Sequence, residues 1–162
     1  MVNKFMHNKV IYNVGLFIIL TSVDHVKVFP TIMNKSDIFI SVRFQCLVFT
    51  LVEGEALLGT INECTPQGLS INLKFFQSIT VDSHYLPTPS KYENNKKRWI
   101  WNKKIGINEY YFTMNSNDDV YFKVLETKYN RLNMINKEMS IEPMITNATL
   151  KQELLGPIVW WE

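Results

Sequence analysis

Two pairs of side chains have the types and spacing that acid–base chemistry uses. Asp82 and His84 stand two residues apart, and Glu53 and Glu55 flank Gly54. A carboxylate can orient a histidine, and two carboxylates can divide an acid and a base role. Catalysis would also need a nucleophile or a third group, and the sequence offers no recognisable one nearby. We therefore interpret the first pair as part of a loop and the second as a solvated hairpin end, and we predict no catalytic site.

Metal and disulfide chemistry are not indicated either. Cys46 and Cys64 lie inside predicted strands, no C-x-x-C occurs, and the three histidines (His7, His25 and His84) are scattered. We interpret the cysteines as small hydrophobic side chains in a reducing compartment. The sequence predicts no metal site and no cofactor.

Basic residues beside aromatic residues form the remaining candidate site. Lys and Arg number 17 against 15 Asp and Glu, so the net charge of +2 gives no bulk attraction to nucleic acid, and a local patch would have to bind it. Lysines could hold a phosphate backbone while aromatic rings stack on bases. For the run from Lys96 to Arg98 the alternative is a solvated loop end, and Trp99 and Trp101 are interpreted as core residues. The candidate RNA-binding residues are Lys74, Lys96, Lys97, Arg98, Lys103, Lys104 and Tyr110.

The elements that must position these residues are strands. The stretch "GTINECTPQGLSINLKFF" (59–76) predicts a hairpin that turns at Thr65–Gly68, because Pro66 presets φ and apolar residues alternate on both sides. Gly59 predicts a bulge or bend within the first strand. Further strands are predicted at 38–52, 98–103, 109–113 and 120–124, with a short terminal one in "LLGPIVWWE". The polar stretch 129–149 has no period, and we expect a variable loop there.

The composition fits one soluble, β-rich protein. The chain has 162 residues, of which 46% are hydrophobic, 20% charged and 13% aromatic. About five strands from Ile38 onward, with no strong helix, predict a five-stranded barrel of the oligonucleotide/oligosaccharide-binding (OB) type. The fold class is therefore mostly β. The stretch before the barrel is too short to form a core alone.

The apolar segment "VIYNVGLFIIL" (10–20) imitates a signal peptide, but Asn13 interrupts it, Asp24 and His25 follow closely, and it is too short to span a bilayer. We predict a buried strand here, with no membrane attachment. Alternation would place Val14, Leu16, Ile18 and Leu20 on one face and Gly15, Phe17 and Ile19 on the other, so both faces require burial. We expect a second protein to supply it. The candidate interface residues are Tyr12, Val14, Leu16, Phe17, Ile18 and Leu20.

Several longer phrases resemble one known family. "YNVG", "LVEGEALLGTI", "FFQSI", "WIW" and the terminal "GPIVWW" occur in the order found in the larger stalk subunit of eukaryotic DNA-directed RNA polymerase III. Related stalk subunits occur in RNA polymerase II and in archaea. The resemblance runs from Asn8 to Trp161.

The resemblance implies a tip domain that docks on the polymerase core (an α+β unit in the family) and an OB barrel that projects along the RNA exit path. It places the tip at 1–37 and the barrel at 38–162. The implied protein is a non-catalytic nuclear subunit that forms a heterodimer with a smaller stalk subunit and acts in transcription initiation. It would contact nascent RNA or initiation factors for small non-coding RNA genes. Family members carry a strand and a helix before the segment that matches Asn8, so we expect a shortened tip. The alternative is a free-standing single-stranded RNA-binding OB protein derived from that subunit.

Overall fold

The computed structural model of the chain describes residues 9–29, 39–130 and 142–161. The chain divides into two compact units, 1–50 and 51–162, which are described separately. Strands dominate both units, as the predicted mostly β class requires. The helices among the described residues are three-residue 3₁₀ turns, and none is long enough to cross a membrane. The predicted boundaries of tip and barrel, 1–37 and 38–162, stay a prediction.

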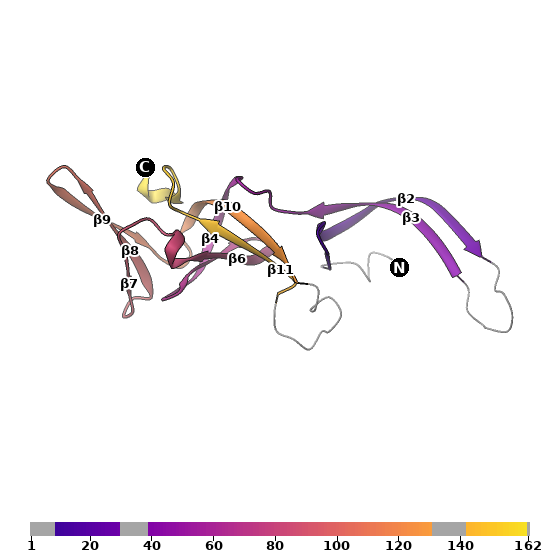
Figure 1. The fold of residues 1–162 in the computed structure, drawn as a ribbon, viewed down its shortest axis with the longest axis horizontal. Coiled ribbons are helices and arrows are strands. Elements are labelled where there is room, and N and C mark those ends of the chain that lie inside the picture. Colours follow the sequence, from indigo (N-terminus) through magenta and orange to yellow (C-terminus); the bar gives the residue numbers. More distant parts are fainter. Residues whose placement is uncertain (1–8, 30–38, 131–141, 162) are drawn as a thin grey trace. The chain divides into compact units, whose positions relative to one another are not determined.

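The first unit is an antiparallel ribbon made of β1 (Val10–Ile11), β2 (Gly15–Phe29) and β3 (Phe39–Phe49) (Figure 1). The sequence predicted two strands across residues 10–29, and the structure has one long strand, β2, after a turn at Tyr12–Val14. β3 matches the strand predicted at 38–52. It pairs along its whole length with β2 rather than with the described strands of the second unit.

Three β-bulges change the phase of β2. The register against β3 shifts between Phe17 and Ile19, between Leu20 and Ser22, and between Val23 and His25. Each bulge inserts one extra residue into β2 opposite β3. Strict alternation of the β2 side chains between the two faces is therefore interrupted at each bulge. The predicted grouping of Val14, Leu16, Ile18 and Leu20 on one face was therefore wrong.

The bulges gather apolar side chains on one face, because directly paired residues share a face. From Phe17 to Val26, apolar residues spaced by three in β2 pair with residues spaced by two in β3. We call this face the apolar ribbon face. Its members are Phe17, Leu20, Val23, Val26 and Val28 of β2 with Val48, Cys46, Phe44, Val42 and Ile40 of β3.

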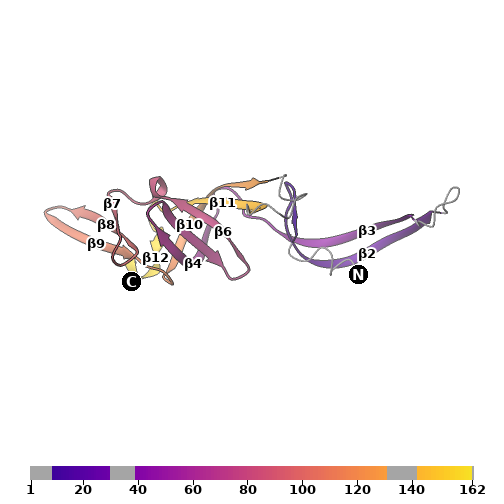
Figure 2. The ribbon, with the colours of Figure 1, turned by 90° about the horizontal axis from the view of Figure 1, so that it is seen from below.

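The second unit contains a closed five-stranded barrel (Figures 1 and 2). Its strands are β4 (Ala56–Thr65), β5 (Gly68–Leu73), β6 (Phe76–Asp82), β10 (Asp119–Tyr129) and β11 (Met144–Thr149). They follow the order β11-β6-β5-β4-β10, and a pairing between β10 and β11 closes the ring. β11 runs parallel to β6, whereas the other pairs are antiparallel. The predicted OB-type barrel is confirmed.

The predicted hairpin is confirmed, but Gly59 is needed for a reason other than the predicted bulge or bend. Thr65 pairs with Gly68 across the turn, as predicted. The bulge of β4 lies between Ile61 and Glu63 and not at Gly59. A Cβ on Gly59 would lie 2.7 Å from Ile71 and 3.0 Å from Phe122, so close packing requires this glycine. β5 ends at Leu73, earlier than the alternation suggested.

The fifth strand was missed. Residues 129–149 were expected to form a variable loop, but Met144–Thr149 forms β11, while 131–141 lie outside the described residues. Met144, Thr146 and Ala148 face the core, and Thr146 is fully buried. The hydroxyl groups of Thr146 and Thr127 lie 3.0 Å apart, which satisfies the buried hydroxyl. Because Thr146 occupies an inner-face position, the sequence of β11 shows no clear apolar alternation.

A second sheet extends from the barrel between β6 and β10. It consists of β7 (Ser90–Glu93), β8 (Arg98–Ile105) and β9 (Asn108–Met114), and Figure 2 shows the β8–β9 hairpin projecting away from the barrel strands. Trp99 anchors this sheet, since its indole N–H donates to the Thr65 carbonyl at 2.9 Å. Tyr92 donates to the Cys64 carbonyl at 3.1 Å. The base of the hairpin is therefore fixed to β4.

The chain ends on a turn rather than a strand. The predicted terminal strand is reduced to β12 (Gly156–Pro157), and the 3₁₀ turn η2 (Ile158–Trp160) follows it. Another 3₁₀ turn, η1 (Ser83–Tyr85), follows β6. A Cβ on Gly156 would lie 2.5 Å from the ring of Trp160, so the chain folds back tightly here.

Candidate functional site

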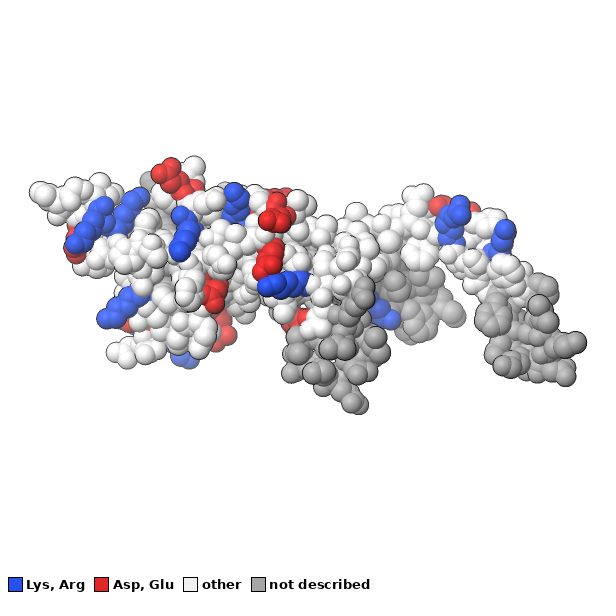
Figure 3. All heavy atoms as spheres, in the orientation of Figure 1, with Lys and Arg blue, Asp and Glu red and all other residues white. Residues whose placement is uncertain are grey.

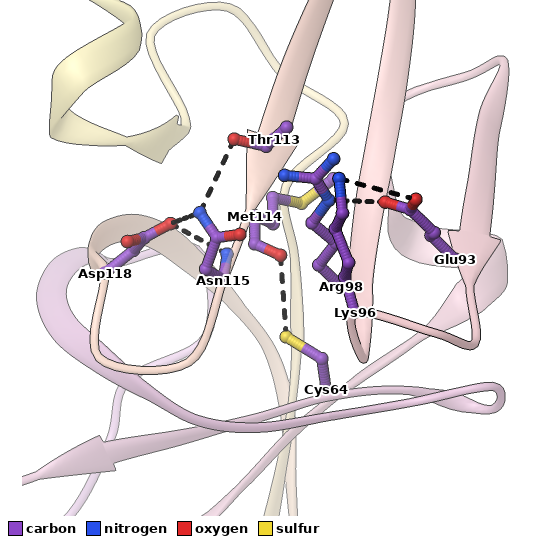
Figure 4. A network of polar contacts seen from close by, with 8 residues as sticks. All are labelled: Cys64, Glu93, Lys96, Arg98, Thr113, Met114, Asn115 and Asp118. Atoms are coloured by element: carbon purple, nitrogen blue, oxygen red, sulfur yellow. Dashed lines mark hydrogen bonds and ion pairs between the residues drawn. The ribbon is translucent and has the colours of Figure 1, made fainter.

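Acidic neighbours pair with part of the predicted basic run. The Arg98 guanidinium donates to Glu93 at 2.6 Å, and the Lys96 ammonium lies 3.9 Å from the same carboxylate (Figure 4). Lys97 occupies the turn between β7 and β8, with φ of 48°. A phosphate would have to compete with Glu93 for two of the three cations. An RNA contact by this run, and its alternative of a solvated loop end, stay predictions.

Lys104 is also paired. Its ammonium lies 2.9 Å from Glu109, which also accepts a hydrogen bond from the Tyr111 hydroxyl at 3.1 Å. The hydrogen bond between the two side chains raises the pKa of Lys104 and lowers that of Glu109. Both residues lie on the same face of the β8–β9 hairpin as Tyr111. Lys74 lies elsewhere, in the turn between β5 and β6. Figure 3 shows that basic side chains on the visible face stand at separate places with acidic ones among them.

The structure also brings together Lys103 and Tyr110. They are directly paired across β8 and β9, on the face opposite Lys104. The Lys103 ammonium lies 5.1 Å from the centroid of the Trp101 ring and 6.0 Å from that of Trp161. A cation over an indole face is attracted by the ring quadrupole. Lys103 is therefore held against aromatic rings, and no carboxylate of the described residues is paired with it.

The same face carries a cluster of aromatic rings, which we call the aromatic cluster. Trp101 lies 5.3 Å from Phe112 and 5.3 Å from Trp160 between ring centroids, and Trp160 lies 6.5 Å from Trp161. The Trp160 indole N–H donates to the Thr113 carbonyl at 3.0 Å and so attaches η2 to β9. Sequence reasoning missed Trp160 and Trp161 because it placed them in a strand. The adjacent tryptophans were the available signal.

The groove on β5 and β6 is polar. It has a volume of about 620 Å³ and includes Gln67, Ser70 and Tyr85 in its lining. Thr80 donates to Asn147, Asn147 donates to Glu126, and the Lys128 ammonium lies 2.6 Å from Glu126. The hydrogen bonds from Lys128 and Asn147 lower the pKa of Glu126. This groove offers hydrogen bonds and paired charges, and its lining includes the rings of His84 and Tyr85.

Asp82 and His84 belong to the same groove and serve a local structural role. Asp82 caps η1, because its carboxylate accepts the His84 backbone N–H at 2.9 Å. The ring Nδ1 of His84 lies 2.7 Å from the same oxygen, and both side chains are largely exposed. The backbone and ring hydrogen bonds from His84 lower the pKa of Asp82. The nearby Ser83 hydroxyl donates to Asp82 as well. This is the geometry of a capped turn.

Cys64 lies in the barrel wall, as expected for a small hydrophobic residue. Its thiol is 3.6 Å from the Met114 carbonyl, and burial raises its pKa to about 11 (Figure 4). Cys46 lies half-buried on the apolar ribbon face. The two thiols belong to different units.

The predicted interface residues divide by exposure. Leu16 and Phe17 are buried, Tyr12, Ile18 and Leu20 are half-buried, and Val14 is exposed. Further along the ribbon, several exposed apolar residues lie on the apolar ribbon face, whereas Ile19, Leu47 and Phe29 are exposed on the other face. Val26 is 55% exposed, Val28 63% and Ile40 56%. The bulges that place them on one face could not be read from the sequence.

Comparison with known proteins gives one consistent family. A family model described as RNA polymerase III subunit Rpc25 matches residues 55–142. DNA-directed RNA polymerase III subunit RPC8 of Bos taurus is 31% identical over 130 residues, which cover 78% of this chain and 62% of that protein. The rpc8 subunits of Schizosaccharomyces pombe and Dictyostelium discoideum are each 26% identical over 99% of this chain, covering 86% and 74% of those proteins. The chain thus spans less than two thirds of the Bos taurus relative.

Proposed function

Because the chain belongs to the RNA polymerase III subunit Rpc25 family, we propose that it acts as a non-catalytic stalk subunit of DNA-directed RNA polymerase III. The observation that carries this proposal is the family match, which begins at the start of β4 and continues beyond β10. The matched region contains four of the five barrel strands, β4, β5, β6 and β10. The proposed role is in transcription initiation at genes for small non-coding RNAs, in the nucleus.

The ribbon is the proposed docking element. We propose that it binds the smaller stalk subunit, as a heterodimer, and the polymerase core. The apolar ribbon face supports this, because contiguous exposed apolar surface on a folded protein marks an interaction site. Val26, Val28 and Ile40 form part of such a surface. Val14 and Ile18 of the predicted interface lie near its beginning.

The barrel unit is the proposed contact for nascent single-stranded RNA or for initiation factors. Lys103 and Tyr110 support an RNA contact, since a cation and an aromatic ring lie side by side on one face. We also propose that the chain has no catalytic site of its own. This proposal is supported by the capping role of Asp82 and the large exposure of its histidine partner to solvent.

Rapid depletion of the protein in the cells that express it tests the proposed function. Newly made small non-coding RNAs should fall within the time of depletion, while newly made messenger RNAs are unchanged at first. Metabolic labelling of nascent RNA measures both classes in one sample. Unchanged small-RNA synthesis after complete depletion would contradict the proposal and would favour a free-standing RNA-binding protein.

A further inference from the structure

A cavity of about 350 Å³ lies beside the aromatic cluster, within the second unit. β8 contributes Trp101 and Lys103 to its lining, and the C-terminal segment contributes Lys151, Glu153, Leu155 and Trp161. One wall is therefore aromatic, and two of its charged members are lysines. The volume is at the lower end of the range for small-molecule sites.

Trp161 offers an open ring at this cavity. Its side chain is 41% exposed, whereas a tryptophan that serves only packing is usually highly buried. Lys103 lies over both Trp161 and Trp101, and no carboxylate pairs with it among the contacts of the described residues. A flat ring with an adjacent free cation is the arrangement that holds a base and its neighbouring phosphate.

Trp101 adds an unused donor to the same wall. Its indole N–H is buried and has no hydrogen-bond acceptor in the described chain. Buried polar groups are almost always paired, so the unpaired N–H of this lining residue leaves hydrogen-bonding capacity next to the cavity.

The groove on β5 and β6 has the opposite character. Its lining includes two carboxylates, Asp82 and Glu126, and its cation Lys128 is already paired with Glu126. Gln67 and Ser70 in its lining offer no ring for stacking, so His84 and Tyr85 are its ring-bearing lining residues. This surface therefore disfavours a nucleic-acid strand.

We propose that the cavity beside Trp161 takes one base of single-stranded RNA, away from the β5–β6 groove. The base stacks on Trp161, and Lys103 and Lys151 hold the adjacent phosphates. This inference rests on the proposed RNA contact of the stalk subunit and assigns it to particular residues.

Binding of a labelled oligouridylate of about twelve nucleotides, within the length that one OB barrel covers, tests the site. The full chain, fused to a solubility partner at its N-terminus, is titrated by fluorescence anisotropy at several salt concentrations. Trp161→Ala should weaken binding by roughly tenfold or more. Lys103→Gln should reduce the salt slope by about 0.7 to 1.

Lys104→Gln and Tyr111→Ala are the matched controls, because they alter the same hairpin on its other face. They should change affinity by less than about twofold. Thermal melting identifies any variant that has lost its fold, and Lys103→Gln keeps the test valid if Trp161→Ala unfolds. Equal losses for Lys103→Gln and Lys104→Gln would overturn the site.

The inference would also be overturned if the parent chain did not bind the oligouridylate. It would likewise be overturned if ultraviolet crosslinking joined residues of this face to protein and not to RNA. Either result leaves the proposed function open to its own test, since recovery of the polymerase with the tagged protein is measured separately. Retained polymerase recovery by Lys103→Gln with lost RNA binding would support both.

Discussion

The ring of Trp160 lies directly over Gly156, at a distance where a Cβ on the glycine would be 2.5 Å from a ring carbon. Gly156 has φ of 113°, a conformation that favours glycine. Trp160 in turn contacts Trp101 and Phe112. One glycine thus sets the position of the aromatic cluster.

Gly156→Ala should displace Trp160 and loosen the aromatic cluster. We expect a loss of about 2–4 kcal/mol in the free energy of unfolding, since strain and overpacking act together. Near-ultraviolet circular dichroism should weaken, and tryptophan emission should shift to longer wavelength. Gly106→Ala is the control, because its φ is also positive and a Cβ there meets nothing within 4 Å. Equal spectra for the two variants would contradict the role given to Gly156.

Gly68→Val should damage folding of the barrel. A Cβ at Gly68 would lie 2.0 Å from the Val81 carbonyl oxygen, and φ is 152°. Backbone atoms cannot move aside as a side chain can, so we expect a loss of about 3 kcal/mol or more in urea denaturation. Gly54→Ala, at a glycine with open space around it, should cost about 1 kcal/mol. A parent-like midpoint for Gly68→Val would show that the hairpin is assigned wrongly.

The opening hairpin and the barrel could be predicted because their signals are local. Pro66 and Gly68 mark the turn, and period-two alternation marks β5 and β10. The residues of β2 follow no single period. Bulges place every third residue on one face, and a pattern search for strands expects every second one.

The aromatic cluster was hidden for a different reason. Lys103 and Tyr110 are seven residues apart in the sequence, and their pairing depends on the register of the β8–β9 hairpin. Trp161 reaches Lys103 only because η2 returns the chain to this sheet. Neither register nor the path of a chain end is encoded in residue spacing.

Val26→Lys should separate this protein from its proposed partners without unfolding it. Val26 is 55% exposed on the apolar ribbon face, so a lysine there can reach water in the free chain but would bury a charge in an interface. Recovery of partner proteins with the tagged variant should fall at least tenfold. Gln45→Lys, on the other face of the ribbon, is the control. Full recovery with Val26→Lys would exclude this face as the docking surface.

The two cysteines should differ in reactivity towards iodoacetamide. Burial raises the pKa of Cys64 to about 11, so at pH 8 only on the order of one thiol in a thousand is thiolate. Since thiolate is the reactive form, raising the pH from 8 to 9 should still leave Cys64 largely unmodified. Cys46 should be alkylated first in the native protein, and urea should expose Cys64. Mass spectrometry of the peptides measures both sites, and rapid native alkylation of Cys64 would contradict its place in the barrel wall.

Affinity purification of the tagged full chain from the cells that express it tests the central claim most directly. Quantitative mass spectrometry should find the largest subunits of RNA polymerase III in near-stoichiometric amounts, together with a smaller stalk subunit. Recovery of the chain alone, or with the subunits of another polymerase in place of these, would contradict its assignment as a working subunit of RNA polymerase III.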